Sequence, residues 1–186
     1  MQSKTLLASL LGLAAGVTAV TTANSTSTSI AAAVQLRLVD LDLGYQKTYF
    51  ELERAAAGGS GAPTADTVIT TYNTTVAAEK QDVESKAQPT MALPEAVQLA
   101  LCNAYHSLVL NGNTLNNAWA EHAGLFDKTQ KNTLQELFTT VNDETSRFFA
   151  DVAQKVLPVC AAVVQADNAA LYQSLNRAVV ALDPSA

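Results

Sequence analysis

Apolar residues recur along this chain at helical spacing. From Ala31 onward they return every three or four residues, and no segment shows the two-residue alternation of a strand. The first helical segment carries two neighbouring apolar stripes. One stripe is Leu36, Val39, Leu43 and Phe50, and the other is Leu38, Tyr45, Tyr49, Leu52 and Ala56. Two adjacent stripes predict a helix that buries a broad face.

Glycine and proline residues mark where the first two helices end. The run Gly58-Gly59-Ser60-Gly61 interrupts the first helix. Thr64 or Asp66 is suited to cap the second helix. That helix is expected to end at Gln88-Pro89, because a proline disfavours helical geometry in the residue before it.

Three more helices are predicted in the second half of the chain. Pro94 opens the third, where Asn111-Gly112-Asn113 predicts a kink or break. The fourth runs from about Thr133 to Val156, and Pro158 stops or bends it. The last helix ends before Asp183-Pro184.

Short connections between amphipathic helices favour antiparallel neighbours. We therefore expect an all-α fold, an antiparallel bundle of about five amphipathic helices over residues 31–183. The chain has 186 residues, which suits one domain. With 48% hydrophobic and 15% charged residues, it is too apolar for a disordered chain and too weakly charged for a coiled coil.

The first residues have the pattern of a secretory signal peptide. Lys4 precedes a short apolar run, Thr5 to Val17, and small residues follow it. We expect cleavage after Ala19, so that 1–19 is the signal peptide. The run is too short to span a membrane, although an N-terminal anchor is the alternative reading. Residues 20–30 are rich in Ser and Thr and are expected to form a flexible lead-in.

Sequons and cysteines agree with an extracellular or cell-wall location. Asn24 and Asn73 each begin an Asn-x-Ser/Thr sequon and are predicted glycosylation sites. Cys102 and Cys160 are the only cysteines, and an oxidising compartment favours a disulfide between them. The alternative is two separate buried thiols.

The sequence contains no recognisable catalytic, metal or nucleic-acid motif. Neither His106 nor His122 has zinc-ligand spacing. Cys102 and His106 are four residues apart, but a disulfide cysteine beside a partly exposed histidine explains them better than a reactive pair. Asp40 and Asp42 lie on different helix faces, which is poor geometry for paired acid–base catalysis. The net charge of −6 disfavours nucleic acid and anionic headgroups. We expect no cofactor, no metal and no enzymatic activity.

Aromatic residues in the second half are the candidates for ligand contact. Phe148 and Phe149 are consecutive and so point about 100° apart, which a narrow core stripe does not accommodate. Either a broad core takes both, or one faces a cavity or the surface. With Trp119 and Phe138 they form the predicted set of ligand-contacting residues.

The second half also resembles a known family. Leu125-Phe126-Asp127-Lys128 is followed by Leu134 and Leu137, by Phe-Ala-Asp-Val-Ala-Gln-Lys-Val-Leu-Pro over 149–158, and by an apolar run over 178–182. This pattern resembles the fungal hydrophobic surface-binding protein A family, also called cell-wall galactomannoproteins. The resemblance is specific over about 125–182 and rests on pattern rather than on a rare motif.

The resemblance implies a secreted helical protein without catalytic residues. Some members adsorb to hydrophobic surfaces and recruit polyester-degrading enzymes, and related mannoproteins hold fatty acids between helices. No functional residue carries over one by one. Two features depart from the family: the cysteine pair, and an extra residue in the family's Lys-Val-Pro segment, which here reads Lys155-Val156-Leu157-Pro158.

Together these observations predict a secreted, non-enzymatic protein that binds hydrophobic surfaces or fatty-acid-like lipids at a fungal cell exterior. Binding in a cavity and binding on an outer face both stay open at this point, and a secreted hydrolase is a further possible partner. The alternatives are a structural or antigenic cell-wall mannoprotein and a helical inhibitor of a secreted enzyme.

Overall fold

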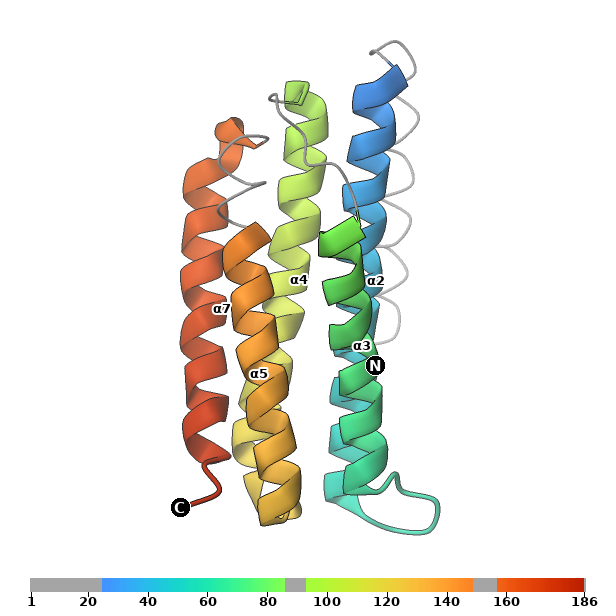
Figure 1. The fold of residues 1–186 in the computed structure, drawn as a ribbon, viewed down its shortest axis with the longest axis vertical. Coiled ribbons are helices and arrows are strands. Elements are labelled where there is room, and N and C mark those ends of the chain that lie inside the picture. The colour runs from blue at the N-terminus through green and yellow to red at the C-terminus, as the bar shows by residue number, and fades with distance from the viewer. Residues whose placement is uncertain (1–24, 86–92, 149–156, 186) are drawn as a thin grey trace, which may run out of the picture.

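The computed structural model describes residues 25–85, 93–148 and 157–185 (Figure 1). These residues form five α-helices, two short 3-10 helices and no strand, so the predicted all-α bundle is confirmed. The predicted signal peptide over 1–19 lies outside the described residues. The helices are α2 (Ser25–Ala57), α3 (Ala65–Ser85), α4 (Glu95–Glu121), η2 (Ala123–Leu125), α5 (Lys128–Phe148), η4 (Pro158–Cys160) and α7 (Ala161–Ala181).

Consecutive α-helices alternate in direction, and the five helices form two layers (Figure 1). In one layer α4 lies between α2 and α7, and it packs extensively against both. In the other layer α3 contacts α5, while α3 also packs on α2 and α5 on α7. The helices of each layer therefore run parallel to one another, because they are separated along the chain by a helix of the other layer.

Local capping explains where α3 and α5 begin. The backbone N–H of Thr67 donates to Thr64 Oγ1, as expected for a cap at Thr64. Asp127 and Gln130 form a reciprocal pair at the start of α5: Gln130 N donates to Asp127 Oδ1, and Asp127 N donates to Gln130 Oε1. This capping box starts α5 at Lys128, before the predicted start at Thr133.

The start of α2 also differs from the prediction. The helix begins at Ser25, so residues 25–30 of the expected flexible lead-in are helical. Extending an existing helix adds one hydrogen bond per ordered residue, whereas nucleation is the unfavourable step. A long helix stabilised by packing further along the chain can therefore include a Ser/Thr-rich first turn.

The connection from α2 to α3 depends on its glycines. Gly58, Gly59 and Gly61 adopt φ values of 67°, 101° and 79°, a region that residues with a Cβ rarely occupy. Arg54 Nη2 donates to the carbonyl oxygen of Gly61 at 2.9 Å and closes the turn against the end of α2. The predicted helix break at this run is confirmed.

The kink predicted at Asn111-Gly112-Asn113 is wrong, because α4 continues through all three residues. The segment serves instead as the contact between α4 and its two neighbours. A Cβ on Gly112 would lie 2.8 Å from Leu171 Cδ1 and 3.1 Å from Tyr45 Cε2, so the glycine allows α2 and α7 to approach α4 closely. The same polar residues that suggest a turn in sequence are satisfied here by partners on other helices.

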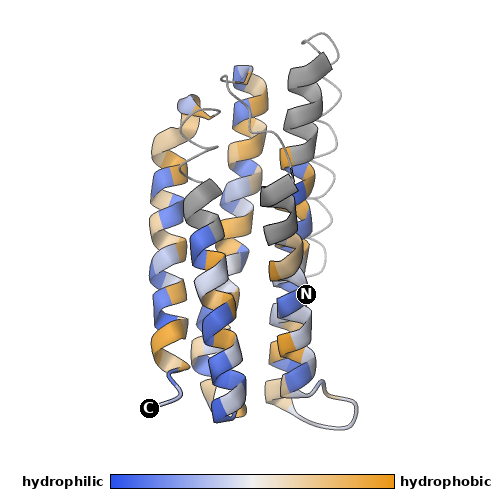
Figure 2. Cartoon of the chain, viewed as in Figure 1, coloured by the Kyte–Doolittle hydropathy of each residue, from blue (hydrophilic) through white to orange (hydrophobic). Residues whose placement is uncertain are grey.

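A single hydrophobic core runs between the two layers. Figure 2 shows hydrophobic and hydrophilic residues alternating along the helices, as amphipathic helices require. The largest fully buried side chains are Trp119, Tyr72, Tyr105, Phe138, Leu52, Leu101, Leu115, Leu134, Leu157 and Leu182. Every α-helix of the described chain contributes to this core.

Candidate functional site

Helix α2 has one apolar face in the core and another in solvent. Its inner face buries Leu38, Tyr45 and Leu52, which are 5%, 3% and 0% exposed. Leu36, Leu43 and Phe50 are 64%, 47% and 54% exposed and form what we call the outer stripe. The prediction that both stripes are buried is therefore wrong for the outer stripe.

The position of α2 in the bundle explains this difference. α2 is an edge helix of its layer, and it contacts α4 on one side and α3 on the other. These two neighbours cover only the inner face. Leu36, Leu43 and Phe50 are seven residues apart, close to two helical turns, so they align along the opposite side. The outer stripe is thus a row of three exposed apolar side chains, one every two helical turns.

Other exposed apolar side chains are distributed over α4, η4 and α7. Leu99, Val159 and Val163 lie within three residues of the cysteines at one end of the bundle. The others are Leu110, Tyr172 and Val180, and Leu125 lies in η2. None of these helices shows three large exposed apolar residues at regular seven-residue spacing, which distinguishes the outer stripe of α2.

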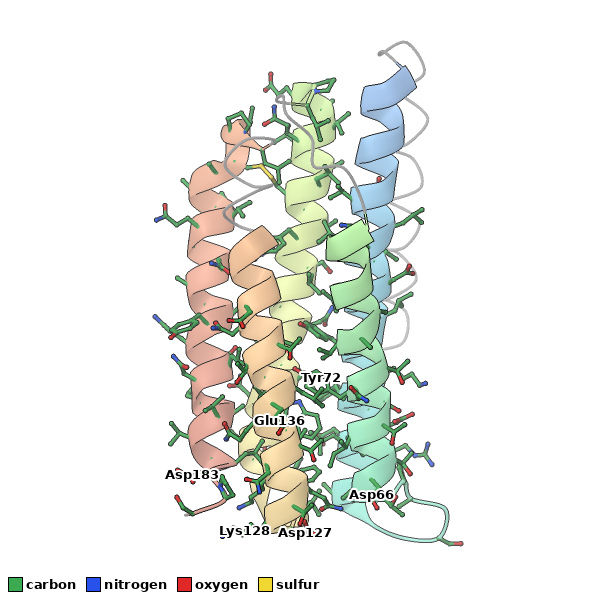
Figure 3. The ribbon with its side chains drawn as sticks, in the orientation of Figure 1. Asp66, Tyr72, Asp127, Lys128, Glu136 and Asp183 are labelled. Carbon is green, nitrogen blue, oxygen red and sulfur yellow. A yellow bond between two sulfur atoms is a disulfide. The ribbon has the colours of Figure 1, made fainter. Side chains whose placement is uncertain are left out.

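Two of the predicted ligand-contacting residues lie deep in the core. Trp119 and Phe138 are 0% and 1% exposed. Their rings form an aromatic cluster with Tyr72 and Phe126, in which centroids are 5.4 to 6.1 Å apart (Tyr72 is labelled in Figure 3). In this structure both side chains serve core packing, and ligand contact by them stays a prediction.

The other two predicted ligand-contacting residues are Phe148 and Phe149. Phe148 is the last residue of α5, and its side chain lies outside the described part. Phe149 lies outside the described residues altogether.

Cys102 and Cys160 form the predicted disulfide, which joins α4 to η4 (Figure 3). The buried side chain of Gln98 reinforces the same junction. Its Nε2 donates to the carbonyl oxygen of Leu93, and its Oε1 accepts from the backbone N–H of Val159 at 3.0 Å. One end of α4 is thus fastened to the beginning of α7 covalently and by hydrogen bonds.

The two histidines each pair with a carboxylate on another helix. His106 Nδ1 lies 2.9 Å from Asp167 Oδ1, and His122 Nε2 lies 3.1 Å from Glu53 Oε1. The His106 side chain is 51% exposed, in agreement with an ordinary surface histidine near a disulfide. Sequence reasoning missed both pairs, since the partners are 61 and 69 residues apart.

The histidine pairs are not part of a metal-binding cluster in the described part of the chain. Within residues 25–85, 93–148 and 157–185, no group of three or more His, Cys, Asp or Glu side chains is arranged to hold a metal ion. The His106 pair joins α4 to α7, and the His122 pair joins the residue directly after α4 to α2.

The surroundings of Asp42 disfavour its charged form. Burial raises the pKa of Asp42, because removal from water destabilises the ionised form. Asn111 Nδ2 donates to Oδ1 at 2.6 Å and Gln46 Nε2 to Oδ2 at 3.1 Å, and both bonds act in the opposite direction. Asp42 thus links α2 to α4, whereas Asp40 is exposed to solvent.

The predicted glycosylation sites fall in different parts of the chain. Asn73 lies on α3 with its side chain exposed. The third residue of its sequon, Thr75, packs against Gly44 of α2, and Thr75 Oγ1 donates to the carbonyl oxygen of Thr71. Asn24 lies outside the described residues. A glycan on Asn73 would extend from α3 into solvent.

Comparison of the chain with protein-family models, with curated proteins and with solved structures gave no match. Among the described helices, none has the length and continuous hydrophobicity needed to cross a bilayer.

Proposed function

We propose that this is a secreted, non-enzymatic protein that binds hydrophobic surfaces or lipids at a fungal cell exterior. The observation that carries the proposal is the outer stripe, because soluble domains rarely align several large apolar side chains in solvent without a binding partner. The disulfide fits an extracellular location. The pattern resemblance to the hydrophobic surface-binding protein A family supports the same function.

The outer stripe is large enough to contribute useful affinity. Leu36 and Phe50 are fourteen residues apart, so the stripe extends over roughly 20 Å of helix. Transfer of three half-exposed side chains from water to an apolar phase is favourable by about 3 kcal/mol in total. This corresponds to roughly a hundredfold preference for the surface.

The charge of the protein favours apolar over electrostatic attachment. The net charge of −6 opposes attraction to an anionic membrane. Binding that depends on the outer stripe should therefore persist at high salt, because screening weakens electrostatic attraction and leaves the hydrophobic effect in place.

Adsorption to polystyrene beads tests the proposal with two matched variants. The first carries Leu36→Ser, Leu43→Ser and Phe50→Ser, which remove the outer stripe. The second carries Leu110→Ser, Tyr172→Ser and Val180→Ser, which remove three comparably exposed side chains from α4 and α7. We expect the first variant to adsorb at least about tenfold more weakly and the second to adsorb nearly as the unmodified protein does.

Native mass spectrometry with a long-chain fatty acid separates the modes of binding. A one-to-one adduct that survives removal of the outer stripe would show binding elsewhere, between the helices, and would contradict the role given to the stripe. Absence of both adsorption and adducts would contradict the proposed function and favour a structural or antigenic wall mannoprotein.

A further inference from the structure

We propose that the outer stripe of α2 also pairs two copies of this protein, with the two α2 helices antiparallel. The proposal concerns the same surface as the proposed function but requires no lipid. It rests on the seven-residue spacing of Leu36, Leu43 and Phe50 and on the charges beside them. Residues seven apart lie on one face of a helix and occupy one of the two apolar positions per heptad along which paired helices pack.

A row of charged residues follows the stripe on one side. Asp40 and Lys47 lie four residues after Leu36 and Leu43, respectively, and both are exposed. Seven residues separate them, about 10 Å along the helix, so they are too distant to pair within one molecule. Arg54 continues the row four residues after Phe50, so the row reads Asp40, Lys47, Arg54 and changes from acidic to basic along the helix.

A single two-fold axis satisfies both the apolar and the charged positions. The midpoint of Leu36 and Phe50 is Leu43, and the midpoint of Asp40 and Lys47 is half a residue further along the chain. That difference is about 0.75 Å along the helix, well within side-chain reach. Around this axis Leu36 meets Phe50 of the second copy, Leu43 meets Leu43, and Asp40 lies beside Lys47 twice.

The parallel arrangement lacks this complementarity. If the two α2 helices ran parallel, the charged row of one copy would lie beside the opposite flank of the stripe in the other copy. On that flank, Asp42 is the only acidic residue that would lie beside Lys47. Asp42 instead faces α4 and accepts hydrogen bonds from Asn111 and Gln46. The flanking charges therefore specify the antiparallel orientation, as such positions commonly do in helix pairs.

A two-fold pairing of this kind is closed, because the same surface is used on both copies. It would cover the outer stripe in water and would compete with adsorption to an apolar surface. In the paired state, the outer stripe of α2 is therefore shielded from water.

Sedimentation equilibrium of the secreted full chain, without lipid or detergent, tests the pairing. We expect a concentration-dependent dimer that Leu43→Lys converts to a monomer. Leu110→Lys is the control, since Leu110 is equally exposed but lies on α4, and it should leave the dimer intact. A monomer at all concentrations up to the millimolar range, or a dimer unaffected by Leu43→Lys, would overturn the proposal.

Charge reversal tests the orientation. Asp40→Lys alone and Lys47→Asp alone should each weaken dimerisation about tenfold, because every altered contact occurs twice in a two-fold dimer. The variant with both reversals restores opposite charges and should dimerise as the unmodified protein does. If the double variant is no better than the single ones, antiparallel pairing is excluded. Adsorption is measured separately on beads, so either idea can fail without the other.

Discussion

The two ends of the bundle are held together by different interactions. At one end, the aromatic cluster of Tyr72, Trp119, Phe126 and Phe138 fills the space between α3, α4 and α5. At the other end, where α4 and α7 begin, the disulfide and the hydrogen bonds of Gln98 join the helices. Aromatic packing stabilises the first end, and the disulfide and the hydrogen bonds of Gln98 stabilise the second.

The two ends differ in the size of the core side chains that pack there. The rings of Tyr72, Trp119 and Phe138 contact one another and Phe126 contacts Trp119, so the cluster buries much apolar area and also interacts through ring edges and faces. Near the disulfide the core residues Leu93, Val97, Leu157 and Val164 are smaller and aliphatic. A covalent link there limits the unfolded chain and so stabilises the fold without requiring large side chains.

The largest effect is expected at the aromatic end. Trp119→Ala should lower the free energy of unfolding by about 4–5 kcal/mol, because it removes a fully buried ring and leaves a cavity among three others. Chemical denaturation measures this loss. Tyr172→Ala removes a half-exposed ring from α7 and should change stability by less than about 1 kcal/mol. Equal losses in the two variants would contradict the importance of the cluster.

Removal of the disulfide should have a slightly smaller effect. The cysteines are 58 residues apart, and a closed loop of that length stabilises by about 4 kcal/mol in the chain-entropy model. Cys102→Ser with Cys160→Ser should show this loss in thermal unfolding. The unmodified protein measured with a reducing agent should then match the double variant. If reduction changes nothing, the bond contributes little to holding this end together.

A smaller effect is expected between the two ends, where α2 and α3 approach at Gly44. A Cβ on Gly44 would collide with the side chain of Thr75, which is branched and cannot rotate away freely. Gly44→Ala should destabilise by about 1–2 kcal/mol in spite of the better helix propensity of alanine. Gly124→Ala is the control, because nothing lies near its Cβ position. Stabilisation by Gly44→Ala would show that α3 shifts easily.

The smallest effect concerns the pH dependence of stability through Asp42. The pKa of Asp42 is raised in the folded state, so folding favours the protonated carboxyl. The contribution of Asp42 protonation to the free energy of unfolding is fully present below the unfolded pKa of about 4. It is lost as the pH rises through the folded pKa. Relative to Asp42→Asn, which keeps an acceptor for Asn111, the unmodified protein should therefore lose stability over that range. Unfolding at a series of pH values measures it, and a flat difference would contradict the burial of Asp42.

Local chemistry made much of this fold predictable. Residues close in sequence predict the number of helices, the cap at Thr64 and the glycine break after α2. The disulfide is predictable because the chain has only two cysteines. The start of α5 was also encoded locally, in Asp127 and Gln130, and a search for that capping box would have found it. From the sequence, Trp119 and Phe138 were candidates for ligand contact, and their packing in one aromatic cluster depends on how α3, α4 and α5 meet.

The amino-acid sequence by itself determined an all-α chain with amphipathic helices and one cysteine pair. Only the tertiary structure decided which apolar stripe of α2 faces the core, because Leu38 and Leu36 belong to stripes with the same helical spacing. It likewise decided that Gly112 is a close contact rather than a kink, and that His106 meets Asp167. The physical reason is common to all three: helical periodicity describes one helix, whereas burial depends on where its neighbours lie.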